Sequence, residues 1–158
     1  MTTITVPPWI PIAEKELGVA EVAGAASNKR VLEYLRSCET LPANMQAVDS
    51  TAWCSAMVNW CIEQAGLRGT NKANARSWLA WGAPCSFIAG AVVVFSAPDR
   101  GEAAGHVGFA LYESDKLVWT LGGNQNNRVC GAFYPRDRLL GYRWPTVAEF
   151  VAKTVVKP

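Results

Sequence analysis

The chain is poor in histidine, because His106 is the one imidazole among its 158 residues. A single histidine excludes a metal site built from several imidazoles. The five cysteines add no zinc pattern, since none are spaced as CxxC pairs. We therefore expect no metal and no cofactor, and any chemistry that needs an imidazole must use His106.

The chain also lacks a strong charge and a long apolar run. Lysine and arginine exceed aspartate and glutamate by a formal charge of +2, too little to indicate a nucleic acid partner. No apolar stretch reaches the length of about 20 residues that spans a bilayer, so we expect no membrane insertion. The first residues have neither the basic start nor the apolar core of a signal peptide. We expect synthesis in the cytoplasm, with release to a site of action by another device.

The length and composition favour one domain. Half of the 158 residues are apolar, which is enough for a sizeable core. We predict a single domain over residues 1–158, acting as a monomer.

One stretch, from Asp49 to Gly66, predicts the helix around which the rest is organised. Asp49 and the two residues after it are good helix caps, and Gly66 suits a helix end. Ser55, Asn59 and Glu63 recur every four residues and predict one narrow wet stripe. The remaining surface is apolar, so this helix should be buried on most sides.

Cys54 stands in the first turn of this helix, where the helix dipole and free backbone N–H groups favour a thiolate. The common alternative for a helical cysteine beside a tryptophan is a core thiol. We interpret Cys54 as a nucleophile. The other cysteines are interpreted as reduced structural thiols, namely Cys38, Cys61, Cys85 and Cys130.

The order of the remaining elements predicts an α+β fold with N-terminal helices packed on an antiparallel sheet. Helices are expected at 9–17, at 28–37 and at 75–81, with a connector over 39–48 and a short or frayed helix from 147. Strands are expected at 91–95, 106–111, 118–123, 129–134 and 140–144.

Alternation in the hairpin formed by 106–111 and 118–123 sets a register. Pairing Gly108 with Gly122 places His106 opposite Asn124 and gives the strands one face of small residues. A face without large side chains lets a helix approach closely. We therefore predict that the Cys54 helix lies on the Gly108 and Gly122 face, with Cys54, His106 and Asn124 converging at one edge.

Such a set has a chemical meaning. A thiol reacts well at neutral pH when an imidazole takes its proton and a third polar group orients that imidazole. Asn124 is the predicted orienting residue and Gln125 the second candidate. The alternative for Asn124 is a turn residue, because Gly-Gly-Asn-Gln is good turn chemistry.

Four segments resemble the CHAP-type peptidoglycan amidohydrolases, which are papain-like and related to NlpC proteins. The residues from Asp49 to Trp60 resemble their nucleophile segment and Gly105-His106-Val107-Gly108 their histidine strand. Gly122-Gly123-Asn124-Gln125 resembles the strand with their third residue, and Leu140-Gly141-Tyr142-Arg143-Trp144-Pro145 also fits. Many members carry a glutamate where this chain has Gly122, which leaves Asn124 as the candidate.

The resemblance implies a papain-like fold with the nucleophile at the N-terminus of the central helix. It implies hydrolysis of an amide bond in bacterial peptidoglycan by Cys54, His106 and Asn124. The predicted substrate contacts are Asp49, Trp53 and Gln125. The alternatives are a loop or cap role for Asp49 and a core position for Trp53.

The resemblance leaves the biological setting open. A phage endolysin acting on the cell wall and a secreted antibacterial effector of the same chemistry fit equally well. A non-catalytic module that binds wall peptides and a thiol acyltransferase are alternatives of other classes. The bond that is cut, sugar-lactyl to L-alanine or one within the peptide, stays open at this point.

Overall fold

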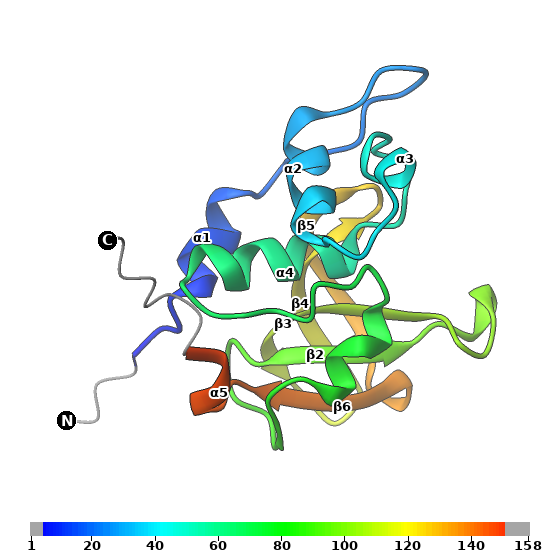
Figure 1. Ribbon diagram of the computed structural model, residues 1–158. Coiled ribbons are helices and arrows are strands. Elements are labelled where there is room, and N and C mark those ends of the chain that lie inside the picture. The colour runs from blue at the N-terminus through cyan, green and yellow to red at the C-terminus, as the bar shows by residue number, and fades with distance from the viewer. Residues whose placement is uncertain (1–4, 151–158) are drawn as a thin grey trace, which may run out of the picture.

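The computed structural model of the protein describes residues 5–150 (Figure 1). Its helices are α1 Trp9–Lys15, α2 Lys29–Ser37, α3 Ala43–Gln46, α4 Cys54–Gln64 and α5 Val147–Phe150. Its strands are β1 Ala83–Cys85, β2 Val92–Ser96, β3 Gly105–Glu113, β4 Leu117–Gln125, β5 Arg128–Pro135 and β6 Leu139–Trp144. Three 3₁₀ turns complete the list, η1 Ala75–Ala80, η2 Pro98–Arg100 and η3 Arg136–Arg138. The predicted tail helix is described as far as Phe150.

The strands form one antiparallel sheet in the order β1-β6-β2-β3-β4-β5, and Figure 1 shows α1, α2 and α4 together as a layer beside it. The predicted α+β class is confirmed. Two short elements were not predicted. β1 contains Pro84, which weakens a strand signal, and the four-residue α3 lies in the expected connector.

The ends of α4 differ in how well the sequence predicted them. The helix begins at Cys54 with Trp53 at the N-cap position and no side-chain cap, so the predicted capping by residues 49–51 is wrong. At the other end Gly66 has a φ of 86°, and its N–H donates to the Glu63 carbonyl while that of Leu67 donates to Ile62. This is a Schellman ending, which requires a left-handed residue that glycine supplies.

Ser55 and Asn59 of the polar stripe of α4 are buried and Glu63 is half-buried, so the prediction that the stripe is wet is wrong. Asn59 has no exposed surface, and its Nδ2 donates to the Ser37 carbonyl while its Oδ1 accepts from the Asn71 N–H. Ser55 is equally buried, and its hydroxyl donates to the Lys72 carbonyl. The stripe therefore ties α2 and the loop after α4 to the central helix, with its polar groups hydrogen-bonded as burial requires.

α4 packs against β3 and β4, but on the face opposite to the one predicted. Gly123 is the small residue under the helix, since a Cβ there would lie 2.7 Å from Trp53 and 2.8 Å from Met57. Val107 and Leu121 belong to the same buried cluster as the helix. The helix packs on the face that carries Val107 and Leu121 because burying their large apolar area contributes more free energy than a close approach to the glycines of the other face.

The face with Gly108 and Gly122 closes on a second apolar cluster. A Cβ on either glycine would lie 3.5 Å from the Cα of the other, so the two strands meet closely there. The residues of this cluster lie on five of the strands or beside them, namely Ala91, Val93, Phe95, Ala110, Val118 and Tyr142, with Tyr134 packed against them. The sheet is thus buried on both faces.

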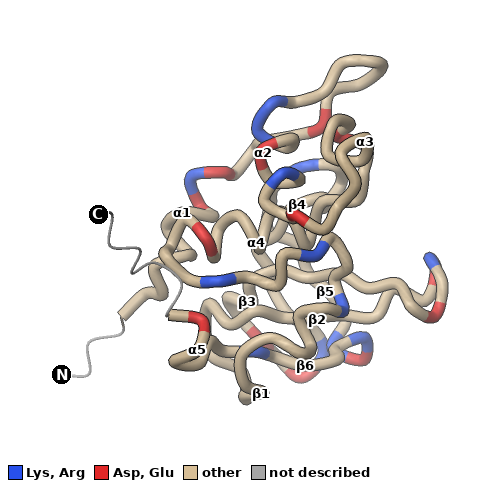
Figure 2. Tube along the Cα trace, in the orientation of Figure 1, with Lys and Arg blue, Asp and Glu red and all other residues tan. Residues whose placement is uncertain are grey.

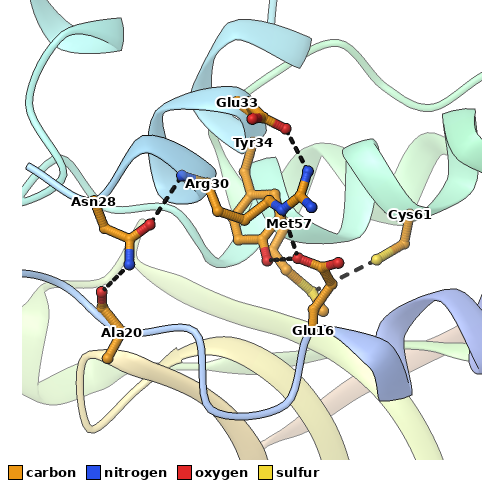
Figure 3. Close-up of polar contacts among 8 residues, drawn as sticks. All are labelled: Glu16, Ala20, Asn28, Arg30, Glu33, Tyr34, Met57 and Cys61. Carbon is orange, nitrogen blue, oxygen red and sulfur yellow. Dashed lines mark hydrogen bonds and ion pairs between the residues drawn. The ribbon is translucent and has the colours of Figure 1, made fainter.

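A polar network joins α1 and α2 beside α4 (Figure 3). The Tyr34 hydroxyl of α2 donates to the carboxylate of Glu16, which follows α1, and Arg30 pairs with the same carboxylate at 3.1 Å. Cys61 of α4 faces this network and contacts Met57, and burial raises the pKa of its thiol above the ordinary value. The prediction of Cys61 as a core thiol is confirmed.

We expect Gly123→Ala to reduce activity more than stability. The added Cβ would meet the buried indole of Trp53, the residue before Cys54, so the predicted nucleophile must shift with it. A displacement of about 1 Å lowers enzymatic rates by about a hundredfold. Activity assays and thermal unfolding would measure the two effects. Gly141→Ala is the control, because a Cβ there meets only Leu79 at 3.8 Å. Equal activity in both variants would contradict the expectation.

Candidate active site

The Cys54 thiol lies at the start of α4 and is 5 % exposed. Burial, the largest influence, acts to raise the pKa of this thiol. A hydrogen bond with His106, the charge of that imidazole and N–H donors of Val107 and Ser55 oppose burial, and together they lower the pKa below the ordinary value. The surroundings therefore favour the thiolate form of Cys54.

His106 is the second residue of β3 and is 5 % exposed. Its Nε2 lies 2.9 Å from Oε1 of Gln125. The amide nitrogen of Gln125 donates to the carbonyls of Thr120 and Cys130, so its oxygen is the atom left to face the ring as an acceptor. Nε2 must then carry a proton, and Nδ1 is the ring nitrogen available for the Cys54 sulfur.

The predicted pairing of His106 with Asn124 is wrong, although the predicted register holds further along the hairpin. Phe109 pairs with Leu121 and Ala110 with Thr120, as the register requires. Between Gly122 and Gln125 the pairing of β4 with β5 shifts. The orienting contact made by the structure comes from Gln125, the second candidate.

A backbone irregularity explains this exchange. Asn124 has a φ of 54°, a left-handed conformation that asparagine tolerates better than most residues. Such a residue in a strand makes a bulge, which re-aims the side chain that follows. Asn126 and Asn127 also have positive φ and form the two-residue turn into β5. The turn chemistry of this segment was visible in the sequence, but the direction of each side chain was not.

Tyr134 of β5 belongs to the site and was not predicted. Its ring stacks on His106 with centroids 4.8 Å apart and planes 17° apart. The same ring stacks on buried Phe95 at 4.8 Å and 19°. The imidazole is thus held at Nε2 by Gln125 and on one of its faces by Tyr134. No sequence signal could indicate this contact, because it joins β3 and β5 through the curvature of the sheet.

Asp49 and Trp53, the other predicted substrate contacts, have structural partners. The Asp49 carboxylate is 3 % exposed and accepts from the N–H groups of Val22 and Asn28, so it fixes the loop before α2. The Trp53 indole has no exposed surface and donates to Glu21. These contacts favour the loop role for Asp49 and the core position for Trp53.

Within residues 5–150 no group of three or more histidine, cysteine, aspartate or glutamate side chains is placed to hold a metal ion. Across the same residues, no helix has the length and apolar character needed to cross a membrane.

We expect iodoacetamide to alkylate Cys54 in preference to Cys38 and at a pH below the ordinary thiol pKa of about 8.5. The lowered pKa keeps the thiolate populated as pH falls, whereas burial raises the pKa of Cys38 to about 12. His106→Ala removes the interactions with the imidazole that lower the pKa of Cys54. Burial then raises this pKa, so the alkylation rate should fall at neutral pH. Mass spectrometry of the labelled site against pH would measure this. Equal labelling of Cys54 and Cys38 would contradict it.

The comparisons bear on the fold. No family model and no curated protein matches the chain. Among solved structures, the chain is similar to a protein from Staphylococcus aureus subsp. aureus Mu50 described as similar to lipoprotein, NLP/P60 family. The match has a TM-score of 0.50 and 18 % identity, and it covers 92 % of this chain and 43 % of that protein. The chain thus spans less than half the length of the protein it resembles.

These findings define the class of fold. The chain has an NlpC-related papain-like fold, in which a central helix packs against an antiparallel sheet. In this chain that helix begins at Cys54, and the facing strand begins with Gly105 and His106.

Proposed function

We propose that the protein is a cysteine-dependent hydrolase that cleaves an amide bond of bacterial peptidoglycan. The observation that carries the proposal is the buried contact of Cys54 with His106, whose other ring nitrogen faces Gln125 at 2.9 Å. The resemblance of the Cys54 and His106 segments to CHAP-type amidohydrolases supplies the substrate class.

In the proposed reaction the Cys54 thiolate attacks the carbonyl carbon of the scissile amide. The negative charge that develops on the carbonyl oxygen is stabilised by the Cys54 backbone N–H at the start of α4. No side chain caps this helix, so capping does not compete for the first-turn donors. His106 then donates its Nδ1 proton to the leaving amine, and the amine departs from a thioester.

His106 also acts in the second half of the reaction. The neutral imidazole accepts a proton from water at Nδ1, and the resulting hydroxide attacks the thioester. The acid product is released and the Cys54 thiolate with the His106 imidazolium is restored. Gln125 keeps Nε2 protonated throughout, so the same nitrogen serves in both steps.

The proposed setting is that of a phage endolysin that acts on the cell wall after release, as a monomer. An antibacterial effector amidase with the same chemistry remains the alternative setting. A module that only binds wall peptides would have no use for a lowered thiol pKa at Cys54, and this favours an enzyme.

Mass spectrometry of purified peptidoglycan after digestion tests the proposal. We expect products that contain a new carboxyl group and a new amine, and their masses identify the bond that is cut. A transferase would instead give a new amide or ester. Absence of any new product with the wild-type protein would contradict the proposal.

A further inference from the structure

A polar cavity of about 190 Å³ adjoins the His106 imidazole. The loop around η2, the turn between β4 and β5, and η3 all contribute to its wall. The lining residues used below are Asp99, Arg100, His106, Tyr134 and Arg138. Neither arginine belongs to the Cys54 and His106 contact, and the proposed reaction does not use them.

The charges in the cavity are unequal. Arg100 and Arg138 are its two cations, and Asp99 is the one acidic residue among its described lining residues. Arg138 approaches Asp99 only at 3.8 Å, and Arg138 is half-buried while Asp99 is exposed. Arg100 donates to the Gly105 carbonyl at 3.1 Å, which holds its guanidinium next to the residue before His106. A guanidinium has five N–H donors in a planar fork that suits a carboxylate.

The position of the cavity beside His106 places it on the amine side of the scissile bond in the proposed reaction. Nε2 of His106 faces Gln125, so Nδ1 is the nitrogen that protonates the leaving amine in the proposed reaction. The acyl part of the substrate is bonded to Cys54, so the part bonded to the amine lies on the His106 side. The cavity adjoins His106, and Cys54 is not among its lining residues. A group on the amine side of the scissile bond therefore reaches the two arginines.

We propose that this cavity binds a free carboxylate on the amine side of the scissile amide. The inference rests on the proposed function and makes it more specific. Stem peptides of peptidoglycan carry free carboxylates on some of their residues, so the preferred substrate is a stem peptide with a free carboxylate next to the bond. The sugar-lactyl bond fits less well, because the alanine carboxyl beside it is already in an amide.

The test compares stem peptides from purified peptidoglycan with the same peptides after conversion of their carboxylates to primary amides. We expect Arg100→Gln and Arg138→Gln each to raise KM for the acid form about tenfold, the scale of one hydrogen bond to a charged group. Their kcat and their KM for the amide form should change little. Asp99→Asn should lower KM for the acid form, because it removes the competing negative charge.

Arg136→Gln is the matched control. Arg136 lies in the same turn η3, but it pairs with Glu113 and does not line the cavity. It removes the same charge from the protein, so its KM for both forms should equal that of the wild type. An equal effect of Arg136→Gln and Arg138→Gln, or no preference for the acid form, would overturn the inference.

Binding to Cys54→Ala separates this inference from the proposed function. Calorimetric titration of this variant with the acid and amide peptides measures recognition without hydrolysis. Tighter binding of the acid form, lost in the double variant with Arg138→Gln, supports the subsite even if the wild-type protein cuts no peptide. Hydrolysis by the wild type without any acid preference supports the enzyme and overturns the subsite.

Discussion

Cys54→Ala is expected to abolish peptidoglycan hydrolysis and to leave the fold intact. The alanine removes the one atom that bonds to the substrate carbonyl, and loss of a nucleophile can cost roughly a millionfold in turnover. The site is buried and small, so the shorter side chain leaves the backbone of α4 undisturbed. Product release from purified peptidoglycan and circular dichroism would measure the two results.

Cys61→Ala is the matched control for this variant. Cys61 lies two turns further along α4, is fully buried and has a raised pKa, so it is unsuited to act as a nucleophile. We expect a loss of about 1 kcal/mol in the free energy of unfolding, a common cost for a core substitution, with activity retained. A folded Cys61 variant without activity, together with an active Cys54 variant, would transfer the nucleophile to Cys61.

Gln125→Ala is expected to lower kcat by about a hundredfold, the scale of loss when a catalytic group is misplaced. Without the Gln125 oxygen, nothing fixes the proton on Nε2 of His106, and the proton can move to Nδ1. A protonated Nδ1 on a neutral ring cannot accept the thiol proton from Cys54. Tyr134 still stacks on the ring, so the loss should remain far below that of Cys54→Ala.

The single histidine makes this prediction directly measurable. All imidazole signals in a ¹⁵N NMR spectrum belong to His106, so they report its protonation without assignment. In the wild-type protein we expect the proton of the neutral His106 ring on Nε2. In Gln125→Ala we expect the neutral His106 ring to be a mixture of both tautomers. A pH series of the spectra would distinguish this change from a loss of structure.

Asn124→Gly is the control for Gln125→Ala. Glycine adopts the positive φ of Asn124 without strain, so the bulge should persist. We expect kcat within about twofold of the wild type, since no hydrogen bond from Asn124 to the imidazole is present and its neighbour holds the ring. A large loss in Asn124→Gly with unchanged kcat in Gln125→Ala would return the orienting role to Asn124.

The elements themselves were largely predictable, because their signals are local. The Asn28 side chain caps α2 and Gly66 ends α4, as predicted, since each residue acts on its own backbone. The paired strands of the β3–β4 hairpin followed from alternation. The start of α4 was less predictable, because the carboxylate of Asp49 bonds to a distant loop instead of capping the helix.

The α+β class and the chemical candidates follow from the sequence alone. The composition shows that the chain has one histidine, and the helical periodicity places one cysteine in the first turn of a helix. Neither conclusion depends on a tertiary contact. The face of the sheet that α4 covers is known only from the folded structure, because both faces are buried and the sequence pattern does not show which element covers each. The same holds for the contacts of Gln125 and Tyr134 with His106, because a bulge at Asn124 and the curvature of the sheet set side-chain directions that no local periodicity encodes.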